Sequence, residues 1–301
     1  MNQASSPAHR FGKVALVGRP NVGKSTLLNT LIGSDLSIVS PKPQTTRHRI
    51  LGIATHAHAQ IAFLDTPGLH LGGKRAMNRQ LNRVARQVPD EADVIVHVIA
   101  APRWTDEDEQ VWQLISQHQV PRLLVVNKID LVKDKADLLP FVATISENRR
   151  YDGIHYLRAT HAKGMAHFLD DLIRFLPEAP AEYGADELTD RSERFIAAEI
   201  IREQLMLRLS EELPYATTVE IEHFEQVGNL ARISAAIWVE REGQKAIVIG
   251  AAGAGLKAIG SNARRRMEKL FGGKVFLELW VKVRENWSDD EASLKQFGYS
   301  G

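Results

Sequence analysis

The chain has 301 residues, of which 44% are hydrophobic and 25% charged, and this composition argues against a disordered protein. It contains no cysteine, which excludes disulfides, thiolate zinc sites and cysteine nucleophiles. No apolar run reaches 18 residues, and the polar stretch 1–13 lacks the apolar core of a signal peptide. We therefore expect a cytoplasmic protein without a transmembrane helix, built from about two domains.

The net charge of +1 conceals an uneven distribution along the chain. Residues 181–240 hold 5 Lys and Arg against 13 Asp and Glu, a net charge of −8. Residues 241–284 hold 10 against 3, a net charge of +7. A basic segment of this kind is the electrostatic footprint expected of a nucleic-acid interface.

Residues 18–25 satisfy the pattern G-x-x-x-x-G-K-[ST]. An apolar stretch at 14–17 predicts a strand before them, and apolar residues at helical spacing predict a helix over 26–32. In such a loop, backbone N–H groups and the helix N-terminus bind phosphate, Lys24 reaches the β- and γ-phosphates, and Ser25 ligates Mg²⁺. A plain glycine-rich turn is the alternative, which the flanking elements disfavour. The predicted nucleotide-binding residues here are Gly18, Arg19, Pro20, Asn21, Val22, Gly23, Lys24, Ser25 and Thr26.

Two later stretches are predicted to complete the magnesium and γ-phosphate site. Residues 41–49 predict an exposed loop, in which we favour Thr46 over Thr45 as a Mg²⁺ ligand; taken alone, this stretch is typical of a surface loop. The predicted strand 60–64 leads into Asp65, Thr66, Pro67 and Gly68, at the edge of the sheet where ligands gather. There Asp65 would hold Mg²⁺ and the Gly68 N–H would contact the γ-phosphate. The predicted metal ligands are thus Ser25, Thr46 and Asp65, and the predicted catalytic residues are Lys24, Thr46 and Gly68.

A fourth stretch predicts which base is bound. Apolar runs at 92–99 and 123–126 predict strands separated by a helix over 107–117, and His97 is expected to be a buried structural histidine. The second run leads into Asn127, Lys128, Ile129 and Asp130. A carboxylate can accept hydrogen bonds from the N1–H and amine of guanine, an edge that adenine lacks, so Asp130 indicates GTP. Asn127 would bind the other edge of the base, and the Lys128 stem would cover the ring.

Together the four stretches resemble the signature set of translation-factor-like P-loop GTPases. The resemblance implies a last guanine contact after the strand predicted at 154–158, from Ala159 or Thr160, and the choice is left open. It places Leu69 where Ras-like enzymes have a water-orienting glutamine, so slow hydrolysis is expected. A K⁺ ion at Asn21 is also left open. Two prolines within 177–181 predict a linker, giving domains 1–180 and 181–301.

The second domain is predicted to follow the order α-β-β-α-α-β, with a G-x-x-G loop joining two of its helices. Its predicted elements are a helix over 189–213, strands over 217–224 and 231–239 with a turn at Gly228–Asn229, a short apolar stretch at 245–249, a helix over 254–270 and a strand over 275–283. This order predicts a type II KH domain, whose glycines let a single-stranded RNA backbone approach closely. A packing turn is the alternative, and at least one arginine of 264–266 is expected to face only solvent. The predicted RNA-binding residues are Gly250, Ala251, Ala252, Gly253, Lys257, Arg264 and Arg265.

These motifs, with P-Q-T-T-R and L-E-L-W-V-K-V, closely resemble the Era family of bacterial GTPases over residues 13–299. The resemblance implies an α/β P-loop GTPase domain followed by a smaller α+β type II KH domain, and it implies binding of GTP, GDP and Mg²⁺. It also implies binding of the 3′ end of 16S rRNA, a role in maturation of the 30S subunit, and peripheral association with the inner face of the cell membrane. We further expect a monomer.

Two other functions are weighed against a GTP-hydrolysing switch. A nucleotide-gated RNA-binding scaffold with negligible turnover is the first alternative. The second alternative is an enzyme that acts on RNA. The last third of the sequence contains no candidate nucleophile or metal cluster for such an activity. The histidines at 56 and 58 are too sparse for a metal site and predict a surface turn.

Overall fold

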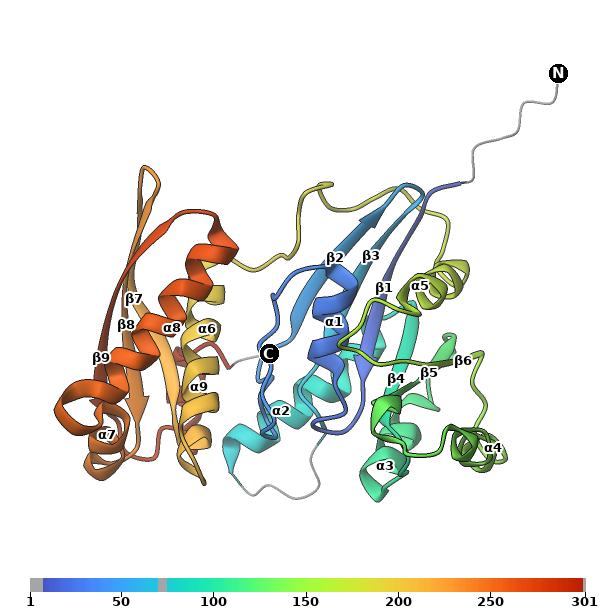
Figure 1. The fold of residues 1–301 in the computed structure, drawn as a ribbon, viewed down its shortest axis with the longest axis horizontal. Coiled ribbons are helices and arrows are strands. Elements are labelled where there is room, and N and C mark those ends of the chain that lie inside the picture. The colour runs from blue at the N-terminus through green and yellow to red at the C-terminus, as the bar shows by residue number, and fades with distance from the viewer. Residues whose placement is uncertain (1–7, 70–74, 300–301) are drawn as a thin grey trace. The chain divides into compact units, whose positions relative to one another are not determined.

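The computed structural model describes residues 8–69 and 75–299, which form two compact units (Figure 1). Of the described residues, unit 1 contains 8–37, 46–69 and 81–190, and unit 2 contains 38–45, 75–80 and 191–299. The units are therefore not two continuous segments, and the predicted boundary after residue 180 stays a prediction. Residues 1–7 of the expected polar N-terminal stretch lie outside the described residues.

Unit 1 contains a six-stranded sheet in the order β2-β3-β1-β4-β5-β6, in which only β2 runs antiparallel to its neighbour. The strands are β1 (Arg10–Val17), β2 (Ile50–His56), β3 (Ala59–Asp65), β4 (Val94–Ala100), β5 (Arg122–Asn127) and β6 (Gly153–Tyr156). The turn at Ala57 and His58 joins β2 to β3 and confirms the surface turn expected there. Strand β2 itself is absent from the predicted elements, because its sequence follows the polar loop without a clear break.

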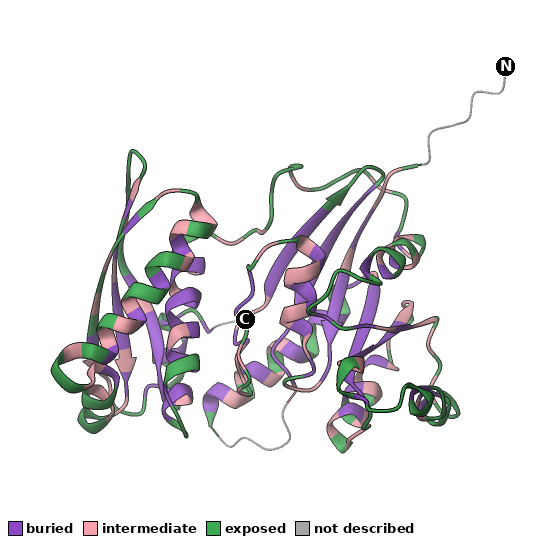
Figure 2. Ribbon diagram, viewed as in Figure 1, coloured by how far each residue is buried: buried purple, intermediate pink, exposed green. Residues whose placement is uncertain are grey.

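Helices cover both faces of this sheet. Val111 and Ile115 of α3 share a buried cluster with Phe11 and Ala15 of β1. On the opposite face, Leu28 of α1 lies so close to Gly52 of β2 that a Cβ there would be 2.7 Å from Leu28 Cδ1. The helices in this part of the chain are α1 (Lys24–Ile32), α2 (Ala76–Gln87), α3 (Asp106–Ile115), α4 (Leu138–Ser146) and α5 (Met165–Arg174). Because both faces are covered, strands β3 and β4 are buried along their whole length, which Figure 2 shows in purple.

Local sequence signals set the ends of several helices. Helix α1 ends at Gly33, whose φ of +68° lets its N–H reach the carbonyl of Asn29. Helix α3 begins with a capping box, in which the Thr105 hydroxyl accepts from the Asp108 N–H and the Asp108 carboxylate accepts from the Thr105 N–H. The ends of these helices are therefore fixed by residues next to them in sequence.

Unit 2 contains a three-stranded sheet in the order β7-β8-β9, with β7 antiparallel and β9 parallel to β8. Its elements are α6 (Glu193–Arg208), β7 (Thr218–Val227), β8 (Leu230–Val239), α7 (Glu242–Ile249), α8 (Ala254–Phe271), β9 (Lys274–Val283) and α9 (Glu291–Gln296). The order α-β-β-α-α-β is confirmed up to β9. Within the described residues, no one helix is long and apolar enough to cross a membrane; α7 and α8 meet that test only together, as a pair bent by 46°.

The predicted helix over 189–213 is too long at both ends. Helix α6 starts after Ser192, whose hydroxyl accepts from the Phe195 N–H, so this residue caps the helix rather than continuing it. At the other end, Leu209 is extended with ψ of 157°, and Glu211 has φ of +52°. Pro214 follows in a short 3₁₀ turn. The helical spacing of apolar residues continues beyond Arg208, but the helical conformation of the backbone ends there.

Candidate functional site

The glycine-rich loop of residues 18–23 connects β1 to α1, as predicted. Gly23 has φ of +104°, and a Cβ there would lie 2.3 Å from Nδ2 of Asn127. A Cβ on Gly18 would lie 2.3 Å from the carbonyl oxygen of Val98. Both positions therefore exclude any side chain, for steric reasons and, at Gly23, for conformational ones. The loop has the tight strand-to-helix geometry that phosphate binding requires.

Lys24 opens helix α1 with only 6% of its surface exposed. Its ammonium donates to the carbonyl oxygens of Gly18 at 2.9 Å and Arg19 at 3.0 Å. Burial lowers the pKa of Lys24 to about 8, and the charge of Asp65 opposes this shift. A polyphosphate bound beside the loop would offset the cost of burying this cation, because opposite charges favour the ionised form.

This pKa predicts how GTP affinity depends on pH. A triphosphate bound beside Lys24 should raise its pKa above about 8, so GTP binding should take up a proton when the free protein has lost it. Affinity should be flat below pH 8 and fall above it, by at most about tenfold per pH unit for one proton. Titration calorimetry between pH 6.5 and about 9 measures the slope. In Lys24→Arg the slope at this step should vanish because arginine stays charged, whereas equal slopes in both proteins would exclude Lys24 as the titrating group.

The side-chain oxygen atoms of Ser25, Thr46 and Asp65, the three predicted magnesium ligands, lie close together. The Ser25 hydroxyl lies 2.8 Å from the Thr46 hydroxyl and donates to Asp65 Oδ2 at 2.6 Å. Ser37 also donates to Asp65 Oδ2, at 2.9 Å. The other carboxylate oxygen, Asp65 Oδ1, is buried without a hydrogen-bond partner, and burial raises the pKa of Asp65. An orphaned buried carboxylate oxygen beside two hydroxyls fits Mg²⁺, which prefers oxygen ligands and would keep the carboxylate ionised.

The same geometry distinguishes the two threonines of the predicted loop. The Thr45 hydroxyl lies 2.6 Å from the Ser40 hydroxyl and donates to the carbonyl of Lys42 at 2.6 Å. Only Thr46 reaches Ser25, so the structure places Thr46, rather than Thr45, with the other two predicted magnesium ligands.

The stretch after β3 lies against the glycine-rich loop. A Cβ on Gly68 would be 2.7 Å from the backbone nitrogen of Pro20. The Thr66 hydroxyl donates to the carbonyl of Leu16 at 3.0 Å, which ties this stretch to β1. Leu69 packs against the buried cluster that contains Phe11. The position after Gly68 therefore carries an apolar side chain directed to the core rather than a polar side chain that orients water.

The residues predicted to bind the base come together from two loops. The Asn127 amide donates to the Val22 carbonyl at 2.7 Å and accepts from the Ala159 N–H at 2.9 Å. The ammonium of Lys128 donates to the Asn21 carbonyl at 2.5 Å. Asn127 and Lys128 thus brace the glycine-rich loop, a role that the base-contact hypothesis did not include, and their contact with guanine stays a prediction.

Asp130 lies at the surface, with its side chain 36% exposed. Arg158 Nε is 3.7 Å from its carboxylate and donates to the Thr160 hydroxyl at 3.0 Å. Ala159 is buried, and its carbonyl accepts from the Thr30 hydroxyl at 2.5 Å. The structure therefore gathers Asp130, Ala159 and Thr160 at one edge of the sheet, and it adds Arg158, which sequence reasoning did not select.

Another contact absent from the predictions joins Arg19 to Asp108. Arg19 Nε lies 3.0 Å from Oδ2 of Asp108, a fully buried carboxylate in the first turn of α3. The pattern T-x-x-D at 105–108 indicates a helix cap that includes the Asp108 carboxylate. Nothing in the sequence indicates that this carboxylate contacts the glycine-rich loop. This ion pair fixes the Arg19 side chain beside the phosphate-binding backbone.

The predicted RNA-binding loop connects α7 to α8 in unit 2. Gly250 and Gly253 have φ of +72° and +79°, and Ala252 adopts +49°. A Cβ on Gly250 would lie 2.9 Å from the Gly255 nitrogen, so glycine is required at this close approach. Ala251 and Ala252 are exposed. The loop thus presents backbone at the surface directly before the N-terminus of α8, a geometry suited to binding phosphate.

The basic residues of α8 have different environments. Lys257, Arg264 and Arg265 are exposed; Arg264 pairs with Glu268 at 3.0 Å, and Arg265 donates to Asn262 at 2.6 Å. Arg266 instead forms an ion pair with Glu203 of α6, so it holds two helices together. Sequence reasoning also missed Phe276 and Trp280, which lie on the same exposed face of β9.

These observations define a P-loop GTPase that carries a type II KH domain. The family model "50S ribosome-binding GTPase" matches residues 13–128, and the model "KH domain" matches residues 212–288. GTPase Era of Xanthomonas oryzae pv. oryzae (strain MAFF 311018) is 59% identical over 299 residues, which cover 99% of this chain and 100% of that relative. The chain belongs to the Era family of GTPases.

Further relatives agree with this assignment. GTPase Era of Stenotrophomonas maltophilia (strain K279a) is 57% identical over 291 residues, covering 97% of this chain and 98% of the relative. A crystal structure of an Aquifex aeolicus Era variant bound to GDP·AlF₄⁻ has a TM-score of 0.94 and 38% identity, with 97% of this chain and 100% of that chain covered. A structure of Era with MgGDPNP and nucleotides 1506–1542 of 16S ribosomal RNA gives the same values. The predicted fold class is confirmed, and the chain is a GTPase that uses GTP, GDP and Mg²⁺.

Proposed function

We propose that this chain is a GTP-driven switch that binds 16S rRNA near its 3′ end through its KH domain and assists maturation of the 30S subunit. The observation that carries the proposal is the G-x-x-G loop, Gly250 to Gly253, whose two middle alanines are exposed, in the same chain as the predicted nucleotide site. The Era complex with nucleotides 1506–1542 of 16S rRNA, which aligns with 97% of this chain, supports the choice of RNA.

The proposed roles in hydrolysis follow from the contacts around the glycine-rich loop. Ser25, Thr46 and Asp65 would hold Mg²⁺, which when bound neutralises charge on the β- and γ-phosphates. Lys24 stabilises the charge that develops on the transferred phosphoryl group, and the Gly68 N–H contacts the same group. Leu69 packs into the core, so no side-chain amide orients the attacking water from this position, and turnover is slow. K⁺ binding by Asn21 stays a prediction.

A physical connection from the nucleotide site toward the KH domain supports a switch. Residues 38–45 belong to unit 2, whereas the next residue, Thr46, belongs to unit 1 and contacts Ser25. The Val39 N–H donates to Glu203 of α6 at 3.0 Å, and Arg202 of α6 donates to the Thr45 carbonyl at 2.5 Å. A change at Thr46 on loss of the γ-phosphate would therefore act on the segment held by α6. This continuity supports control of the KH domain by the bound nucleotide. A single-turnover assay with Mg²⁺ and RNA separates the two alternatives: phosphate release favours the hydrolysing switch, and its absence favours the nucleotide-gated scaffold with negligible turnover.

Changing the two alanines of the G-x-x-G loop to aspartate tests the RNA assignment. The exposed Ala251→Asp and Ala252→Asp changes place negative charge against the RNA backbone, and aspartate tolerates the positive φ of Ala252. RNA affinity should fall by at least about tenfold, since like charges in an interface cost several kcal/mol, while GTP turnover stays unchanged. Fluorescence anisotropy with the 3′-terminal segment of 16S rRNA, at one fixed salt concentration, measures the change.

The control is Ala292→Asp, which adds one negative charge at an exposed position of α9 in the same unit and should leave RNA affinity unchanged; each single loop variant, Ala251→Asp or Ala252→Asp, is the charge-matched comparison. Equal affinity for the RNA in the loop variant and the unmodified protein would contradict the KH assignment. The same titration in GDPNP and in GDP tests the switch: tighter binding in GDPNP is expected, and identical affinities would contradict nucleotide control.

Three further attributes belong to the same proposal. We infer a cytoplasmic location and a monomeric state, and from the family resemblance we infer peripheral association with the inner face of the membrane.

A further inference from the structure

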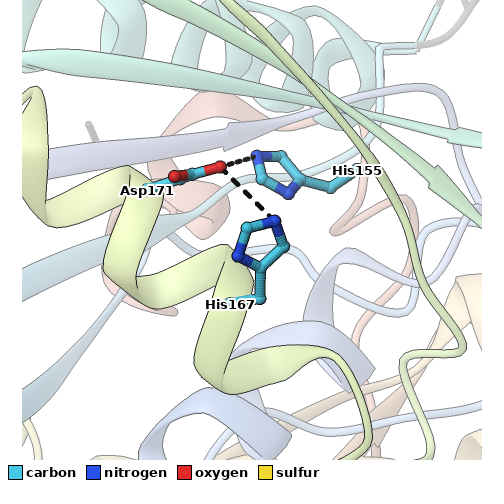
Figure 3. Close-up of side chains that lie close together, drawn as sticks. All are labelled: His155, His167 and Asp171. Carbon is cyan, nitrogen blue, oxygen red and sulfur yellow. Dashed lines mark ion pairs between the residues drawn. The ribbon is translucent and has the colours of Figure 1, made fainter.

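Two histidines and one aspartate, none of them assigned to nucleotide or RNA, lie together in unit 1 (Figure 3). His155 belongs to the edge strand β6, and His167 and Asp171 belong to α5. His167 and Asp171 are four residues apart, so they occupy one face of the helix. Asp171 Oδ2 lies 3.7 Å from His155 Nε2 and 3.8 Å from His167 Nε2. One ligand atom from each residue lies within 4.8 Å of the other two.

His155 provides the observation that points to a ligand. The residue is 6% exposed, and its Nε2 atom is buried without a hydrogen-bond partner. The ring packs edge-to-face on Phe168, with 5.1 Å between centroids, which fixes its orientation toward Asp171. Buried polar atoms are almost always paired, so an orphaned imidazole nitrogen facing a second imidazole and a carboxylate needs a partner.

We propose that His155, His167 and Asp171 form a binding site for a divalent transition-metal ion such as Zn²⁺. Imidazole and carboxylate are common zinc ligands, and four-coordinate Zn²⁺ with bonds of about 2.0–2.2 Å holds its ligand atoms about 3.3–3.5 Å apart. The two distances to Asp171 Oδ2 exceed this by a few tenths of an ångström, and the histidine nitrogens, which lie within 4.8 Å of each other, would have to approach by up to about 1.3 Å. His167 is 79% exposed in its side chain, so it can make that adjustment and leaves a fourth position open to solvent.

The ligand atoms of the cluster suit a transition-metal cation. Asp171 binds Arg174 at 3.0 Å through Oδ1, which leaves Oδ2 directed to the histidines. Two imidazoles select against Mg²⁺, which prefers oxygen ligands and an octahedral shell of waters. The site is therefore chemically distinct from the magnesium site beside Lys24.

A metal here would clamp the connection between β6 and α5. This connection carries Ala159 and Thr160, and its two ends would be joined through His155 and His167. An ion that binds only the folded chain stabilises it, and at 100 times its dissociation constant the unfolding temperature should rise by roughly 5–10 °C.

The test uses the untagged full-length protein, saturated with GDP and a large excess of Mg²⁺. Zn²⁺ affinity is measured by competition with a chromophoric chelator, and Co²⁺ is added to record its visible ligand-field bands. We expect one Zn²⁺ per chain. Loss of a residue that only supports a metal ligand typically weakens metal binding by roughly 10- to 100-fold. His167→Ala and Asp171→Asn each remove a ligand, so each should weaken Zn²⁺ binding by at least this factor. Both positions are at least partly exposed, so these variants should fold, which circular dichroism checks.

The matched controls are His161→Ala and Asp170→Asn, exposed neighbours outside the cluster, which should keep the Zn²⁺ affinity of the unmodified protein. If the unmodified protein binds no more Zn²⁺ than His167→Ala, or if the controls lose as much affinity, the proposal is wrong and the cluster is only a set of ion pairs. This test does not depend on RNA binding or GTP turnover.

Discussion

Asp130→Asn should convert the protein from GTP to XTP. The asparagine amide can donate to the 2-carbonyl of xanthine, whereas it opposes the 2-amino group of guanine with another donor. Losing a charged hydrogen-bond pair costs about 2–5 kcal/mol, so GTP affinity should fall roughly 30- to 5,000-fold while XTP affinity rises. Competition with a fluorescent nucleotide measures both. Because Asp130 lies at the surface, the substitution should leave the fold intact.

Asp137→Asn is the matched control, since Asp137 is an exposed aspartate in the same connection between β5 and α4 and its side chain forms no capping hydrogen bond. It should leave the preference for GTP unchanged. A variant at Asp130 that loses GTP without gaining XTP would show that its carboxylate supports the loop rather than reading the base. Equal binding of ATP and GTP by the unmodified protein would contradict the guanine assignment altogether.

Lys24→Gln should nearly abolish turnover without unfolding the protein. The glutamine amide can still donate to the carbonyls of Gly18 or Arg19, so the loop keeps a hydrogen-bonded side chain. The positive charge is lost, and removing one donor to a developing anion typically lowers kcat about 10²- to 10³-fold. Single-turnover phosphate release measures this loss, and thermal unfolding is expected to change little because a costly buried cation has been removed.

Lys163→Gln removes the same charge from an exposed position in unit 1 and should leave both measurements unchanged. Turnover in Lys24→Gln within a fewfold of the unmodified rate would place the catalytic charge elsewhere, with Arg19 the next candidate because it lies on the same loop. Lys24→Arg keeps the positive charge but changes the size of the side chain, so comparing it with Lys24→Gln separates the effect of the charge from the effect of side-chain geometry.

Much of the nucleotide site could be predicted because its motifs are short and contiguous. Each motif follows a strand of the parallel sheet, and the carboxyl ends of such strands meet at one edge. The positions of Gly18, Lys24, Asp65 and Asn127 near one another therefore follow from strand order alone. The type II KH order could likewise be read from periodicity and from the glycines that end or join helices.

Other parts could not be predicted because they depend on contacts between distant residues. Asn127 was expected on the base, but its amide joins Val22 to Ala159 across the sheet edge. The predicted helix over 189–213 stops at Arg208, because a helical pattern of apolar residues does not report a backbone break. Strand β2 acquires its place only by pairing with β3, and its sequence alone does not distinguish it from the loop before it.

The sequence by itself determined the GTPase motifs, the KH order and the glycines that shape both loops, because each is encoded by neighbouring residues whose backbone geometry is local. Only the tertiary structure decided the pairing of Arg19 with Asp108, the division of residues 38–45 from Thr46, and the meeting of His155 with His167 and Asp171. The spacing of His167 and Asp171 on a helix was visible in the sequence, but their partner lies on a strand twelve residues away from His167. Such clusters form where packing brings separate elements together, and no local sequence pattern specifies how close a strand residue will lie to residues on a helix.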